Sequence, residues 1–131
     1  MNLEGKNIIL TGGSLGIGKE TAKSLINKGA NVLITGRSEE RLINTFKDKK
    51  LNIIEFDVGD IRDPEFIKLC AVRYKVNAIV GIATDVAVPS VARACAALGL
   101  PAIPVEAADI SVNKLLQRNS MKAAGLRVPL F

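Results

Sequence analysis

The 131-residue sequence contains no histidine and no tryptophan, and it has only two cysteines. Without histidine the chain lacks the most common general base, the usual pH-sensitive switch and the side chain found in most zinc sites. We therefore predict no metal site. Cys70 and Cys95 are too few for a disulfide scaffold, and both fall in helical patterns. We expect them to be buried free thiols in a reducing compartment.

Long apolar runs are absent as well, since none reaches the roughly 18–20 residues that a membrane span requires. The first six residues include Glu4 and lead directly into a strand-like run, which is not the pattern of a signal peptide. We therefore expect a cytoplasmic protein with no membrane partner.

Aromatic residues are scarce, at 4% of the chain, and the 18 lysines and arginines do not cluster, although the net charge is +5. The stacking platforms and basic stripes of nucleic-acid-binding proteins are thus missing from the sequence. We predict no nucleic-acid partner, and a small anionic ligand suits the positive charge equally well. Nothing in the sequence indicates the oligomeric state.

Short apolar runs alternate with helical patterns along the whole chain. The runs lie at residues 7–10, 32–35, 52–56, 78–82 and 102–105, and the helical patterns at 17–28, 39–47, 64–74, 86–98 and about 110–125. Nearly continuous apolar strands separated by helices are typical of a parallel sheet covered on both faces. We predict an α/β fold, a single three-layer, doubly wound Rossmann-like domain over residues 1–131, with five strands in the order 3-2-1-4-5.

Several residues mark the expected ends of these elements. Ser38 and Asp63 are suited to capping the second and third helices, and Pro64 to the first position of the third. Asp85 is expected to cap the helix over 86–98, and Asp109 or Ser111 the last helix. The proline within 102–105 suits an edge strand.

A glycine pattern stands between the first predicted strand and the first helix. Gly12 permits a tight turn, Gly16 lets the backbone approach a phosphate, and Gly18 allows the helix to pack close to the sheet. The helix N-terminus then offers N–H groups and a positive partial charge to a pyrophosphate, and Ser14 adds a hydroxyl donor. A glycine-rich connection without a ligand is the alternative. Strand order reverses between strands one and four, so the crevice is expected at residues 12–16 and 83–85.

Residues 11–18, which read Thr-Gly-Gly-Ser-Leu-Gly-Ile-Gly, resemble the cofactor loop of short-chain dehydrogenases/reductases. Residues 34–42 and 56–58 are similar to the ends of the second and third strands in that family, so the likeness covers about residues 3–60. In the family, an acid at the end of strand two favours NAD, because its carboxylate accepts from the ribose 2′-OH. Here Gly36 takes that position and Arg37 follows, so the resemblance implies NADP, bound weakly, with Arg37 on the 2′-phosphate.

The pattern and the resemblance together give one set of cofactor-binding candidates, with the last two flanking the adenine. They are Gly12, Ser14, Leu15, Gly16, Ile17, Gly18, Arg37, Ser38, Asp57 and Val58. The family's catalytic tyrosine and lysine lie four residues apart on a helix, whereas the one tyrosine here, Tyr74, is followed four residues later by Ala78. With no placed acid for proton transfer, we predict no catalytic residues and no enzymatic activity.

The second half of the chain has a different composition. Residues 1–60 contain six asparagines and two alanines, whereas residues 61–131 contain three asparagines and thirteen alanines. Residues 76–92, 98–101, 113–116 and 125–129 resemble the N-terminal domain of carbamoyl-phosphate-synthase-like ATP-grasp ligases, over about 62–131. In such ligases the ATP-clamping lobes lie further along the chain, so we expect neither ATP binding nor ligation.

Three hypotheses for function remain open. The first is an engineered or recombined Rossmann-like domain, joined near residues 59–62, with a residual NADP half-site and no catalytic machinery. Its dinucleotide-binding half would be residues 1–60, and its second half, with the C-terminal helix and tail, residues 61–131. The second hypothesis is the isolated first domain of an ATP-grasp ligase. The third is a small NADPH-dependent short-chain reductase.

Overall fold

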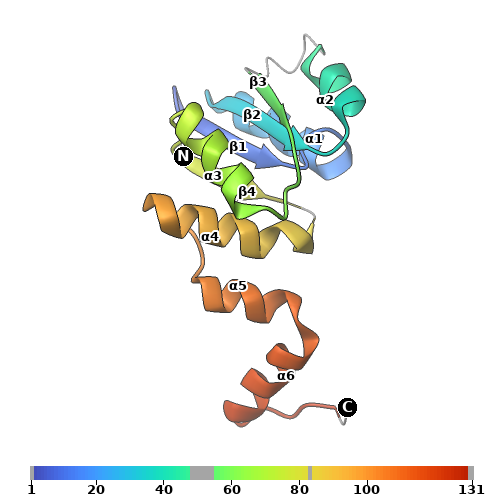
Figure 1. The fold of residues 1–131 in the computed structure, drawn as a ribbon, viewed down its shortest axis with the longest axis vertical. Helices are drawn as coiled ribbons and strands as arrows, with labels where there is room; N and C mark the ends of the chain where they lie inside the picture. The colour runs from blue at the N-terminus through green and yellow to red at the C-terminus, as the bar shows by residue number, and fades with distance from the viewer. Residues whose placement is uncertain (1, 48–54, 83, 130–131) are drawn as a thin grey trace.

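A parallel sheet lies at the centre of the protein, whose computed structural model describes residues 2–47, 55–82 and 84–129. Within these residues the sheet has four strands in the order β3-β2-β1-β4 (Figure 1). The strands are β1 (Asn7–Thr11), β2 (Asn31–Gly36), β3 (Glu55–Val58) and β4 (Ala78–Gly81). All three pairings are parallel, as the sequence predicts. The predicted third strand begins at 52, and its residues 52–54 lie outside the described residues.

Helices cover both faces of the sheet, because successive side chains of a strand point to opposite faces. Ile8 and Leu10 pack with the first helix pair on one face, while Ile9 and Leu33 pack with the second pair on the other. The first pair is α1 (Gly16–Ile26) and α2 (Glu39–Phe46), and the second is α3 (Pro64–Arg73) and α4 (Val88–Leu98). The predicted three-layer, Rossmann-like α/β arrangement is therefore present.

The starts of α2 and α3 follow the predicted capping residues. The Ser38 hydroxyl oxygen accepts from the N–H of Arg41 at 3.5 Å. The Asp63 carboxylate accepts from the N–H of Glu65 at 2.9 Å, and Pro64 opens the helix. These side chains satisfy N–H groups that have no partner within the helix.

The fifth strand predicted over residues 102–105 is wrong. Residues 101–104 form exposed coil, and Val105 begins a helix instead. Pro101 and Pro104 have no N–H, so the stretch offers only two backbone donors to a neighbouring strand. The strand order 3-2-1-4-5 is therefore corrected to 3-2-1-4, and β4 is an edge of the sheet among the described residues.

Two helix predictions in the second half also need correction. Asp85 does not cap a helix over 86–98, because it begins the short 3₁₀ turn η1 (Asp85–Ala87), after which α4 begins at Val88. The last helix, expected over about 110–125 with Asp109 or Ser111 as its cap, is α6 (Lys114–Ala123), and the residues before it form a separate helix, α5 (Val105–Val112), that the sequence did not predict. Asn113 separates them, since its extended backbone ends α5 and its side chain accepts from the N–H groups of Leu115 and Leu116.

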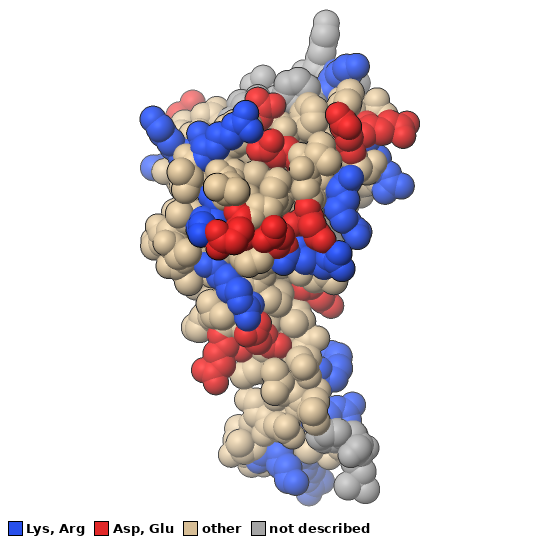
Figure 2. Space-filling view, in the orientation of Figure 1, with Lys and Arg blue, Asp and Glu red and all other residues tan. Residues whose placement is uncertain are grey.

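The last two helices extend beyond α4, away from the sheet (Figure 1). Acidic and basic side chains are interspersed over the face shown in Figure 2. No helix in the described part of the chain is long and apolar enough to cross a membrane.

Candidate functional site

The candidate site begins at the turn after β1, where glycines leave open space around the backbone. Gly12 and Gly16 have φ angles of +74° and +51°, which favour glycine, and an added Cβ at either would meet no atom within 4 Å. At Gly18 an added Cβ would lie 2.2 Å from the carbonyl oxygen of Gly12. Only glycine at position 18 therefore lets α1 start directly against the turn, with the space around Gly12 and Gly16 left free for a ligand.

The first turn of α1 lacks the groups that neutralise the positive end of the helix dipole in α2 and α3. Both α2 and α3 have a side-chain cap and acidic residues in their first turns. Helix α1 has neither, because Leu15 at its N-cap offers no side-chain acceptor and its first turn holds no acid. The positive end of the α1 dipole is thus available to an anion.

Thr45 of α2 connects this turn to the neighbouring helix. Its hydroxyl lies 2.9 Å from the carbonyl oxygen of Ser14 and 2.8 Å from that of Arg41, and the residue is 3% exposed. A buried hydroxyl bond of this kind fixes the loop against α2. The turn after β1 is therefore held against the last turn of α2.

A pocket of about 490 Å³ lies between the turn, the end of β2 and the start of α2. Its lining residues are Gly12, Ser14, Gly36, Arg37, Ser38, Arg41 and Ile61. Arg37 and Arg41 are both exposed, and no carboxylate belongs to the lining. Two guanidinium groups beside free backbone and a hydroxyl form a site suited to phosphate oxygens.

The pocket brings together four of the predicted cofactor residues: Gly12, Ser14, Arg37 and Ser38. Leu15, Gly16, Ile17 and Gly18 lie at the adjoining start of α1, where Leu15 and Ile17 are exposed. The sequence interpretation missed Arg41, Ile61 and Thr45. Arg41 lies in the first turn of α2, three residues after the N-cap Ser38, so its place beside the turn after β1 depends on how α2 packs and has no local signal in the sequence.

The two predicted adenine neighbours lie outside the pocket lining. Val58 is 45% exposed at the end of β3. The Asp57 carboxylate lies 3.6 Å from the Arg73 guanidinium of α3, and that guanidinium lies over the ring of Tyr74. Burial, followed by a hydrogen bond to Asp57, raises the pKa of the Cys70 thiol to about 12. Asp57 is thus engaged with α3.

A second carboxylate, Asp60, lies close to the pocket. The Arg62 side chain donates to it from Nε at 3.0 and 3.1 Å and from Nη2 at 2.7 Å. This bonding is the main cause that lowers the pKa of Asp60 to about 2, and the charge of Arg37 adds a smaller effect. Asp60 is therefore ionised near neutral pH and is paired with Arg62.

Metal ligands do not gather anywhere in the described ranges, where no group of three or more Cys, Asp or Glu side chains could bind an ion. Cys70 and Cys95 are both buried free thiols, as the sequence predicts.

Known proteins that are similar to this chain indicate the family to which the site belongs. A family model described as short chain dehydrogenase matches residues 6–93. The uncharacterized oxidoreductase YvaG of Bacillus subtilis is 41% identical over 66 residues, which cover 45% of this chain and 25% of that protein. The chain thus spans about a quarter of the length of this relative.

The solved structures that resemble the chain fall into two groups. The 2-keto-3-deoxy-D-gluconate dehydrogenase of Streptococcus agalactiae is 27% identical, with a TM-score of 0.57 over 63% of this chain and 34% of that one. Phosphoribosylglycinamide synthetase of Anaerococcus prevotii is 18% identical, with a TM-score of 0.75 over 93% of this chain and 30% of that one. The second likeness shows the fold alone, and it includes the α5–α6 region.

The prediction that the chain is not an enzyme is wrong. The family model and the oxidoreductase relatives point to an enzyme family. The prediction relied on the missing tyrosine–lysine pair, but it looked for that pair in a chain that spans about a quarter of such relatives. The suggested recombination near residues 59–62 stays a prediction.

Proposed function

Because the chain belongs to the short chain dehydrogenase family, we propose that it binds NADP(H) as part of an oxidoreductase. When bound, this cofactor supplies or accepts a hydride, which would interconvert an alcohol and a carbonyl compound. The observation that carries the proposal is the pocket that combines Arg37 and Arg41 with the glycine turn after β1.

The turn provides the part of the site that suits a diphosphate. Positions 12 and 16 leave the space that side chains would otherwise fill, and the α1 N-terminus has no acid in its first turn. Backbone N–H groups at such a helix start bind phosphate oxygens without a counter-cation. These residues would hold the middle of the cofactor.

The start of α2 provides the preference for NADP over NAD. A ribose 2′-OH is recognised by a carboxylate at the end of the second strand, and Gly36 has no side chain there. Arg37 and Arg41 offer two permanent positive charges to a 2′-phosphate, while Ser38 adds a hydroxyl in the same lining. We therefore favour NADP(H), with Arg37 and Arg41 as the residues that select it.

The proposal is tested by titrating the protein with NADPH and NADH and following nicotinamide fluorescence. Arg37→Ala should weaken NADPH binding about tenfold or more, because it removes a hydrogen bond between charged groups, and leave NADH binding little changed. Arg93→Ala is the matched control, since Arg93 pairs with Asp109 on the α4–α5 side. No NADPH binding by the wild-type protein at millimolar concentration would refute the proposal.

A further inference from the structure

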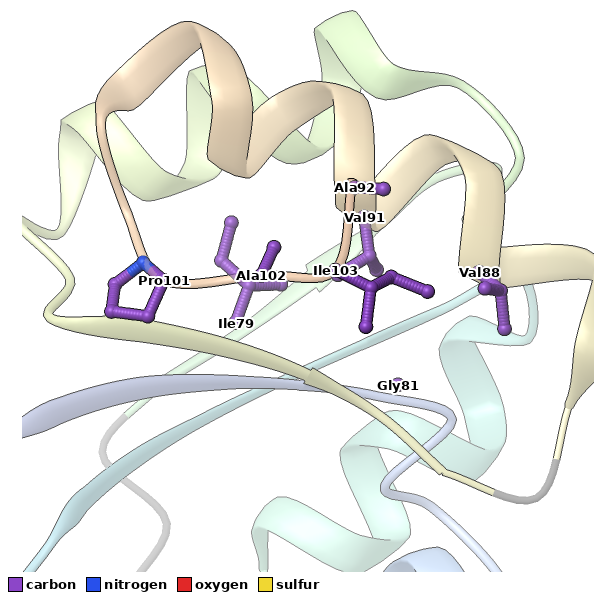
Figure 3. A pocket seen from close by; sticks show the side chains of 8 residues that line it. All are labelled: Ile79, Gly81, Val88, Val91, Ala92, Pro101, Ala102 and Ile103. Carbon is purple, nitrogen blue, oxygen red and sulfur yellow. The ribbon is translucent and has the colours of Figure 1, made fainter. Parts of the chain in front are cut away.

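An apolar pocket of about 260 Å³ occupies the place beside β4 where a fifth strand was expected (Figure 3). It lies between the edge of β4, the first turns of α4 and the coil that follows Leu100. Its lining residues are Ile79, Gly81, Val88, Val91, Ala92, Pro101, Ala102 and Ile103. We call this the β4 pocket.

The lining of the β4 pocket contains no charged side chain and no side chain that forms hydrogen bonds. Ile79 and Ala92 are 7% and 1% exposed and form its inner wall, whereas Ile103, at 51%, borders solvent. The pocket is open to solvent on the side of Ala102 and Ile103, and its volume leaves room for a ring with a substituent against the apolar inner wall. A charged group placed against the inner wall would lose part of its hydration and gain no polar partner from the lining.

The β4 pocket starts next to the proposed cofactor crevice. Gly81, at the carboxyl end of β4, pairs in register with Thr11, the residue directly before Gly12. Parallel strands lie about 4.8 Å apart, so the end of β4 is one strand spacing beyond the glycine turn and two beyond the end of β2. A dinucleotide lies across the strand ends where strand order reverses. With its 2′-phosphate at Arg37, its other end would therefore extend toward Gly81.

We propose that the β4 pocket binds the uncharged apolar group of the substrate, a small aryl or alkyl ketone or the corresponding alcohol. The inference rests on the proposed function, because it is the direction of the cofactor that makes this pocket a substrate site. Val88 and Ile103 border the pocket near Gly81, so the polar end of such a molecule would lie toward the crevice (Figure 3).

The test uses acetophenone as the probe and benzoate as its charged counterpart of similar size. Each is titrated into ¹⁵N-labelled protein while amide chemical shifts are followed. Acetophenone should shift the amides of Gly81 and Ile103, and benzoate should not. Equal binding of benzoate, or acetophenone shifts confined to other parts of the protein, would overturn the proposal, as would no shift at millimolar acetophenone.

Two variants reduce the space in the pocket. Ala102 lies in exposed coil, so Ala102→Phe can fill the pocket without disturbing a helix, and Val88→Phe fills it from α4. Both should weaken acetophenone binding about tenfold, whereas Ala96→Phe, on an exposed position of α4 outside the lining, should change it less than about twofold. Unchanged binding in Ala102→Phe and Val88→Phe would contradict the proposal.

A parallel NADPH titration separates this inference from the proposed function. If NADPH binds and acetophenone does not, the β4 pocket is not the substrate site, while the proposed function stands. If acetophenone binds at Gly81 and NADPH does not bind at all, the proposed function fails and the substrate assignment fails with it. If both bind, a nuclear Overhauser contact between the acetophenone methyl group and the nicotinamide ring is expected, and its absence would overturn the assignment.

Discussion

Arg62 pairs with Asp60, a carboxylate that precedes the pocket residue Ile61 in the chain. It engages both oxygens of Asp60, the carboxylate whose pKa the nearby Arg37 also helps to lower. An Asp60 side chain without Arg62 would be free to pair with Arg37 and would compete with a phosphate for that guanidinium. We therefore expect Arg62 to keep Asp60 from competing for Arg37, although Arg62 does not belong to the pocket lining.

Cys70 gives the molecule a measurable dependence on alkaline pH. Burial raises the pKa of its thiol from 9.0 to about 12. The unfolded chain therefore loses this proton first, so the stabilisation is complete below about pH 9 and is lost as the pH rises toward 12. Between pH 9 and 11 this group should lower the free energy of unfolding by about 2 kcal/mol.

Urea unfolding at a series of pH values measures this effect. The cavity left by Cys70→Ala should cost a similar amount of stability at each pH. Because the variant has no thiol to ionise at this position, its free energy of unfolding should decline less steeply above pH 9 than that of the wild type. Parallel declines in the two proteins would show that the Cys70 thiol does not contribute.

The pocket lining contains predicted candidates that follow directly on β1 and β2 but neither of the two at the end of β3, and the binding role of all of them stays a prediction. Gly12 and Ser14 lie in the pocket because a strand, a turn and a helix follow one another locally. The surroundings of Asp57 could not be predicted, because its partner Arg73 lies sixteen residues further on, in α3. Ile61 reaches the lining in the same non-local way.

At the scale of an element, substitutions in the turn before α1 can separate the effect of backbone strain on stability from the effect on ligand binding. Gly16 and Gly5 have φ angles of +51° and +68°, and an added Cβ at either meets nothing within 4 Å. Gly16→Ala and Gly5→Ala should each cost about 1–2 kcal/mol through left-handed strain, measured by urea unfolding. Only Gly16→Ala should also abolish NADPH binding, since its methyl group enters the phosphate space. Equal NADPH binding in the two variants would place the phosphates elsewhere.

The elements that the sequence predicted correctly are those with local signals at both ends. Helix α3 begins where Asp63 and Pro64 predict, and β1 ends at the glycine turn. The fifth strand failed because an apolar run does not distinguish a strand from coil when prolines remove its donors. The start of the last helix was wrong because Asn113, and not Asp109 or Ser111, caps α6, and a polar residue within a helical pattern does not reveal that role.

At the scale of the whole molecule, the boundary between the two compositional halves is well packed. Gly59 lies so close to the Phe66 ring that an added Cβ would be 2.4 Å from it. The Ser90 hydroxyl of α4 lies 2.5 Å from the carbonyl oxygen of Ile61, and β1 pairs with β4 across the halves. We infer that the sheet and its four covering helices unfold as one cooperative unit.

Helices α5 and α6 are expected to be less stable than that unit. Helix α6 has no buried residue, whereas α5 buries Ala108 and is also joined to α4 by the paired Arg93 and Asp109 side chains at 2.9 and 2.8 Å. Partly exposed ion pairs contribute at most about 1 kcal/mol, and local opening exposes amides to exchange. Amide hydrogen exchange should therefore be fastest in α6, slower in α5 and slowest in β1.

Arg93→Ala tests what joins these helices to the sheet. It should speed exchange in α5 up to about fivefold and leave β1 unchanged, because the pair joins α5 to the exposed side of α4 and does not involve the sheet. Arg73→Ala, which removes a guanidinium from α3 instead, serves as the control and should not affect α5. If α6 is protected as strongly as β1, the two helices unfold with the sheet, and the Arg93–Asp109 pair is not what determines their opening.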